Sequence, residues 1–272
     1  MNKKQGALLL GAFSILFGIA QAGDPFADQV ISYTPGTGIN TSYETPSVAL
    51  GAPASAATIT SPPFQNTDIV GVGNGGELTA AFNTPITNNP AGHAGGMDFT
   101  IFGNEFFTLS GSTISGIFNH TGLTVWVSQD NVSYYQLAAP YGADDYYPTQ
   151  GSGDASVPVN PSLSLSSFTG QTTAQALSLY NGSAGGASYA ISWAEDSGGH
   201  AVNLPSISYI QVQGTSGAGY IDGFSRVADA PEPAGTGLIV AGIGTLFSLG
   251  RQRGRVKKND RFADNTAALS IT

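Results

Sequence analysis

Carboxylates and amides supply most of the groups in this sequence that could bind or react. Three short clusters combine them in neighbouring positions: Asn104-Glu105, Asp144-Asp145 and Glu195-Asp196. Oxygen ligands of this kind suit Ca²⁺, a hard cation that is plentiful outside cells. None of the clusters follows the twelve-residue calcium loop pattern, and the alternative is that they are solvated loop carboxylates. The candidate calcium ligands are Asn104, Glu105, Asp144 and Asp145.

Aromatic residues beside these polar ones indicate a second kind of chemistry. Sugars stack their apolar ring faces on flat aromatic side chains, while carboxylates accept hydrogen bonds from their hydroxyl groups. Two segments of the chain combine both residue types, and the alternative is that their aromatic rings belong to the core. The candidate ligand-binding residues are Tyr146, Tyr147, Trp193, Glu195 and Asp196.

A catalytic constellation is harder to assemble. A glycosidase needs two carboxylates roughly 5 to 10 Å apart across a cleft. Glu105 and Glu195 are a candidate pair, but their spacing in the sequence does not support the pairing. The three histidines, His93, His120 and His200, lack zinc-binding spacing, and no G-x-S-x-G segment is present. We expect a protein that is not an enzyme. The alternative is a secreted polysaccharide-active hydrolase that uses paired carboxylates.

The amino-acid composition excludes several kinds of site and partner. The sequence has no cysteine, which excludes disulfides, thiol nucleophiles and cysteine-based metal sites. Residues 23–230 contain fifteen Asp and Glu but a single basic residue, Arg226. Such an acidic body repels nucleic acid and anionic membrane surfaces, so we expect no nucleic-acid partner.

The N-terminal segment reads as a signal peptide, residues 1–22. Lys3 and Lys4 precede an apolar run at 7–20 that is too short for a comfortable membrane span. Ala20 and Ala22 form a small-x-small cleavage site for signal peptidase, which predicts a mature chain that begins at Gly23.

The C-terminal segment carries a second apolar run at 234–250, long enough for a transmembrane helix. Arg251, Arg253 and Arg255 follow it directly, and residues 256–272 form a basic and polar tail. By the positive-inside rule this tail stays cytoplasmic and the body lies outside. The precursor is therefore expected to be anchored in the inner membrane.

Pro231, Glu232 and Pro233 precede that helix, and the order of motif, apolar helix and arginine cluster over 231–255 resembles a PEP-CTERM sorting signal. The resemblance implies export by a Gram-negative bacterium that makes extracellular polysaccharide. It also implies recognition of the Pro-Glu-Pro motif by an exosortase that removes the tail. The tail at 256–272 is longer than the family usually has.

Between the two signals, residues 23–230 predict an all-β, antiparallel, jelly-roll-like sandwich. Short alternating apolar runs separated by Gly- and Asn-rich turns are typical of such strands. The irregular stretch at 143–186 predicts a long excursion with one short helix near 172–179. The predicted strands are 69–72, 77–82, 98–102, 123–128, 134–137, 189–193, 207–212 and 220–227.

Two further resemblances concern the region between the signals. The segment 125–137 (VWVSQDNVSYYQL) is similar to a hairpin of discoidin-like, galactose-binding-type jelly rolls, with Asn131 at a Gly position and Tyr134 near a Trp position. Segments 26–35, 49–53, 98–104 and 192–209 resemble uncharacterised PEP-CTERM surface proteins. We expect a non-catalytic binding or structural module of the cell surface or extracellular matrix, associated with extracellular polysaccharide.

Overall fold

The computed structural model describes residues 24–118 and 122–230. The expected signal peptide (1–22), sorting signal with its transmembrane helix (231–255) and tail (256–272) lie outside the described residues. Within the described ranges, no helix has the length and apolar character needed to cross a membrane.

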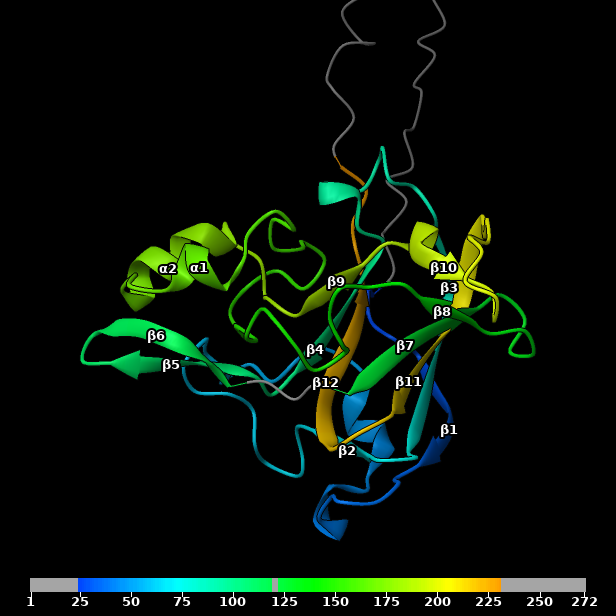
Figure 1. Ribbon diagram of the computed structural model, residues 1–272, viewed down its shortest axis with the longest axis horizontal. Coiled ribbons are helices and arrows are strands. Elements are labelled where there is room, and N and C mark those ends of the chain that lie inside the picture. The colour runs from blue at the N-terminus through cyan, green and yellow to red at the C-terminus, as the bar shows by residue number, and fades with distance from the viewer. Residues whose placement is uncertain (1–23, 119–121, 231–272) are drawn as a thin grey trace, which may run out of the picture. The chain divides into compact units, whose positions relative to one another are not determined.

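Two antiparallel sheets form a β-sandwich (Figure 1). The six-stranded sheet contains, in spatial order, β1 (Gln29–Thr34), β3 (Glu77–Thr87), β11 (Ser206–Gly214), β7 (Leu123–Ser128), β8 (Tyr135–Leu137) and β10 (Ala194–Glu195). The four-stranded sheet contains β2 (Val70–Gly73), β12 (Ala218–Arg226), β4 (Phe99–Gly103) and β9 (Ala187–Tyr189). Inward-facing aliphatic and aromatic side chains of both sheets make one continuous core. The predicted all-β, antiparallel sandwich is confirmed.

A smaller substructure, which we call the lobe, packs around a core of its own. It contains the hairpin of β5 (Phe106–Ser110) and β6 (Thr113–Phe118) and the helices α1 (Leu165–Phe168) and α2 (Thr173–Tyr180). Figure 1 shows the helices beside the hairpin, and the amide of Ile114 donates to the carbonyl of Gln171 between them. Short 3-10 turns lie elsewhere in the chain, at Thr41–Tyr43, Pro46–Ala49, Ala94–Gly96 and Ile191–Trp193.

The hairpin of β7 and β8 shows how the sequence pattern produces the sheet. Leu123, Val125 and Val127 are buried in the sandwich core, while Trp126 on the opposite face is only partly covered. Ser128 departs from the expected alternation because it is buried: its hydroxyl oxygen accepts hydrogen bonds from two amides of the following turn. Asn131 closes that turn with a φ of 59°, a conformation that asparagine tolerates better than most residues.

One predicted strand is wrong. Residues 189–193 leave the sheet after Tyr189 and form a 3-10 turn, because the amide of Ile191 donates to the buried Asp98 carboxylate at 2.7 Å rather than to a neighbouring strand. The helix predicted near 172–179 is confirmed as α2, which begins with a capping box between Thr172 and Gln175. Strands β1, β5, β6 and β10 and helix α1 were not predicted, and β9 overlaps the predicted strand only at Tyr189.

Candidate functional site

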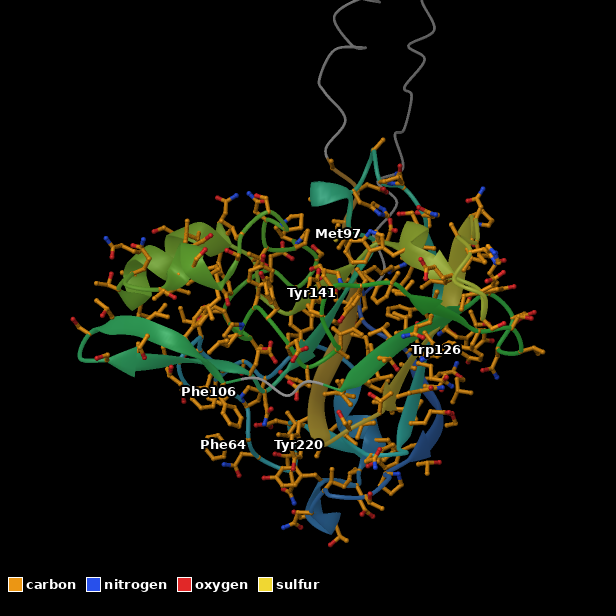
Figure 2. All side chains as sticks on the ribbon, in the orientation of Figure 1. Phe64, Met97, Phe106, Trp126, Tyr141 and Tyr220 are labelled. Atoms are coloured by element: carbon orange, nitrogen blue, oxygen red, sulfur yellow. The ribbon has the colours of Figure 1, made fainter. Side chains whose placement is uncertain are left out.

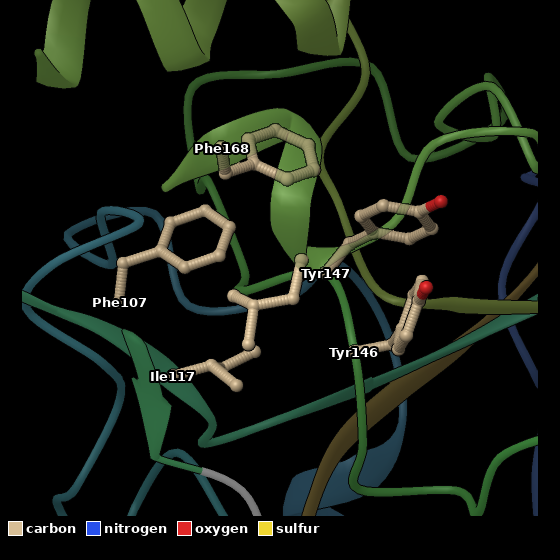
Figure 3. A pocket seen from close by; sticks show the side chains of 6 residues that line it. Phe107, Ile117, Tyr146, Tyr147 and Phe168 are labelled. Atoms are coloured by element: carbon tan, nitrogen blue, oxygen red, sulfur yellow. The ribbon is translucent and has the colours of Figure 1, made fainter. Parts of the chain in front are cut away.

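An apolar pocket opens in the lobe, between the β5–β6 hairpin and α1 (Figure 3). Its volume is about 150 Å³. Phe107 and Phe168 form one wall with ring centres 4.9 Å apart, and Leu165 keeps 37% of its surface exposed. The pocket is lined by Phe107, Ile117, Tyr146, Tyr147, Leu165 and Phe168.

The hydroxyl groups of Tyr146 and Tyr147 already donate hydrogen bonds within the protein. Tyr147 donates to the carbonyls of Leu163 (2.9 Å) and Asn160 (3.1 Å), and Tyr146 donates more weakly to Leu163 (3.3 Å). In Figure 3 both hydroxyls lie on the side of the rings away from Phe107. The pocket therefore offers ring faces and aliphatic carbon rather than polar groups to a ligand.

Tyr146 is the most unusual residue of the pocket wall. It is half-buried and holds a φ of 89°, which for a bulky side chain costs on the order of 1–3 kcal/mol. Its ring stacks on Tyr141 with centres 5.2 Å apart and meets Tyr147 edge-on at 4.7 Å. Tyr141, which is labelled in Figure 2, contacts Tyr189 and Trp193 of the sandwich, so aromatic rings connect the sandwich to the pocket. This network holds Tyr146 in its strained position.

Directly before these tyrosines lies a buried set of oxygen atoms, which we call the carboxylate cluster. It contains Asn104, Glu105, Asp144 and Asp145. The side chain of Asp144 accepts hydrogen bonds from the amides of Asn104 (3.0 Å) and Tyr220 (2.6 Å), so it joins the end of β4 to β12. The structure therefore brings together two segments that the sequence predicted as separate candidate calcium ligands.

Glu105 and Asp144 are close neighbours in the interior. Both their side chains approach the Cα of Gly103 so closely that a Cβ there would lie 2.1 Å from Asp144 Oδ1 and 2.6 Å from Glu105 Oε2. Burial, and after it the charge of Asp144, raises the pKa of Glu105 well above its ordinary value. Burial also raises the pKa of Asp144 to about 7, against the opposing effect of its hydrogen bonds. The pKa of Asp145 is raised by burial as well.

Some oxygen atoms of the cluster lack any hydrogen-bond partner: Asn104 Oδ1, Glu105 Oε2 and Asp145 Oδ1. Buried polar atoms are nearly always paired, so these three atoms need an explanation. Within 24–118 and 122–230, no three Asp, Glu or His side chains converge as a group able to hold a metal ion.

The second candidate segment does not join this site. Trp193 is partly buried against the sandwich core, and Glu195 pairs with Gln136 of β8. Asp196 organises its own turn, because its Oδ1 accepts from the amides of Gly198 (2.8 Å) and His200 (3.0 Å). Of the five predicted ligand-binding residues, only Tyr146 and Tyr147 line the apolar pocket.

Other titratable groups have structural partners. Nδ1 of the buried His93 lies 2.7 Å from Asp98 Oδ1, and Asp98 also accepts from the amide of Ile191, so this pair fixes the turns around it.

A larger hollow of about 820 Å³ adjoins His93 and Arg226 near both ends of the described chain. Glu105, proposed with Glu195 as a hydrolase pair, is 1% exposed and faces Asp144 instead.

No family model matches the chain, and no curated protein matches it significantly.

Proposed function

We propose that this chain is an exported, non-catalytic binding module of the cell surface or extracellular matrix of a Gram-negative bacterium, associated with extracellular polysaccharide. The sequence of its ends supports export by signal peptidase processing, temporary anchoring in the inner membrane and sorting by an exosortase. The arrangement of the sheets, in which strands distant in sequence are paired, supports a jelly-roll type of sandwich similar to discoidin-like modules.

The observation that carries the binding function is the aromatic pocket of the lobe. Ligand sites are typically concave and lined by apolar and aromatic side chains. Here that lining lies beside a strained tyrosine, and strained residues gather at ligand sites. The acidic clusters are buried or occupied by turns, which does not favour the hydrolase alternative.

The lining of the pocket suggests which part of a polysaccharide it receives. The pocket has a volume of about 150 Å³, and its wall lacks free polar partners for the hydroxyl groups of a sugar ring. An acetyl or methyl substituent fits both the size and the apolar character. The partly exposed ring of Tyr146 would then stack on the sugar ring that carries the substituent.

Binding of the full chain to a panel of acetylated and deacetylated polysaccharides tests this function. Tyr146→Ala and Leu165→Ala remove parts of the pocket mouth and should weaken binding about five- to tenfold each, the loss expected for one aromatic or aliphatic contact. Phe64→Ala is the matched control, because Phe64 is 58% exposed and does not line the pocket. Binding that is absent for every polysaccharide, or unchanged in both pocket variants, would refute the proposal.

A further inference from the structure

If its acidic side chains were all ionised, the carboxylate cluster would carry more negative charge than its surroundings could neutralise. It holds three acidic side chains, and residues 24–230 contain one basic side chain that could oppose them, Arg226. Asp144 is bonded to the amide of Tyr220, near the start of β12, whereas Arg226 ends that strand. Six residues of extended strand span roughly 20 Å, too far for direct neutralisation. The guanidinium of Arg226 donates instead to the carbonyl of Asp24.

Three tyrosines near the cluster donate their hydroxyl groups to the backbone. Tyr180 donates to the carbonyl of Pro148 at 2.8 Å, Tyr189 to that of Gly142 at 2.7 Å, and Tyr141 to that of Ser188. These hydroxyls are engaged by the backbone, which leaves Glu105 Oε2 and Asp145 Oδ1 without partners.

The side chain of Asp145 gives the strongest evidence that a partner is missing from the cluster. Its side chain is buried, with 6% of the residue exposed, and Oδ2 accepts from the amide of Gly142 at 2.9 Å while Oδ1 has no partner. A proton shared between Glu105 and Asp144 would satisfy the contact between those two groups but not the free oxygen of Asp145. Oxygen acceptors without donors, gathered in one buried place, are the surroundings that a hard cation requires.

We propose that the carboxylate cluster binds a hard divalent cation of the Ca²⁺ class. Glu105 and Asp145 would supply charged ligands through the oxygens that lack partners, and Asn104 its amide oxygen. Ca²⁺ accepts carbonyl and water oxygens in a flexible shell, so it does not need three converging carboxylates in advance. The cation would tie the end of β4, which leads into the lobe, to the loop that carries Tyr146 and Tyr147 into the pocket wall.

Calorimetric titration of the chelator-treated full chain with CaCl₂ tests the proposal, together with thermal unfolding in CaCl₂ and in EDTA. We expect one site per chain and a Tm higher by roughly 5–10 °C at a hundredfold excess of Ca²⁺ over Kd. Glu105→Gln and Asp145→Asn keep the shapes of the side chains and should each weaken Ca²⁺ binding about tenfold or more, since ligand charge tunes affinity. Glu195→Gln is the matched control outside the cluster and should bind as the wild type does.

Two results would overturn the inference: no binding heat and no change in Tm with Ca²⁺, or Ca²⁺ binding that both cluster variants retain at wild-type strength. Should Glu105→Gln fail to fold, Asp145→Asn decides the question, because Asp145 is the more accessible of the two. The outcome is independent of the proposed function. A chain that binds Ca²⁺ but no polysaccharide would keep the inference and refute only the proposed ligand.

Discussion

Asp222 offers the clearest test of the electrostatic reasoning, because it lies outside the carboxylate cluster and is buried. It lies at the bulge of β12, with 2% of its surface exposed, and both carboxylate oxygens accept from the amide of Ala54 at 3.0 and 3.1 Å. Burial raises its pKa to about 7, and the charge of Asp68 acts in the same direction. The folded protein therefore keeps a proton on Asp222 under conditions in which the unfolded chain has lost it.

The sign of the pH dependence follows from this difference. When the pH rises from about 4 to about 7, the unfolded carboxyl ionises first, so the free energy of unfolding falls; above about 7 the loss is complete. A pKa of about 7 rather than 3.8 corresponds to a loss of roughly 4 kcal/mol, an upper value for one group. Other buried carboxyls contribute with the same sign, so the effect of Asp222 must be isolated by a variant.

Asp222→Asn keeps one oxygen for the Ala54 amide and removes the ionisation. We expect the variant to be less stable than the wild type by about 1 kcal/mol near pH 4, the cost of an imperfect hydrogen bond. Near pH 8 it should be more stable, by as much as about 3 kcal/mol. Urea unfolding followed by the fluorescence of Trp126 and Trp193 at both pH values measures the difference. Glu44→Gln, at an exposed residue, is the control. A difference between Asp222→Asn and wild type that is the same at both pH values would refute the reasoning.

Two further predictions concern the lobe. Thr149→Val removes the buried hydroxyl that donates to the carbonyl of Gly103, at the end of β4, at 3.0 Å. The substitution should lower the free energy of unfolding by about 1–3 kcal/mol. A neutral effect in urea unfolding would show that this hydrogen bond does not stabilise the fold. Phe168→Ala removes a fully buried ring and should cost about 3–5 kcal/mol and weaken polysaccharide binding. Calorimetry that finds wild-type stability in this variant would contradict the described packing of the lobe.

Much of the sandwich could be predicted because its central strands carry their burial pattern in the sequence. In β7 the apolar residues alternate with Thr124 and Trp126, and the bounds predicted for this strand agree with the structure. Strand β1 was missed because it lies at the edge of its sheet with mostly exposed side chains, so period-two alternation is weak. The error at 189–193 has a different cause: the turn depends on Asp98, about ninety residues earlier, whose role no local pattern reveals.

The candidate site was only partly predictable for the same reason. The residue types indicated Asn104-Glu105 and Asp144-Asp145 as separate candidates. Their meeting depends on contacts between distant segments, because Asp144 accepts from the amides of Asn104 and of Tyr220 in β12. The apolar pocket was not predicted, since Phe107, Leu165 and Phe168 come from segments that showed no regular pattern. The available signal was the run Phe106–Ser110 directly before the Gly111-Ser112 turn, because a short run rich in aromatic residues and bounded by Gly and Ser is typical of a hairpin strand.

The most direct test of the binding function is the ratio of Kd values for one extracellular polysaccharide before and after chemical deacetylation, measured with the wild type and with Tyr146→Ala. The proposed function predicts that the wild type binds the acetylated form about tenfold more tightly or better, and that the ratio falls toward one in the variant. Equal affinity of the wild type for both forms, or a preference that survives in Tyr146→Ala, would contradict it.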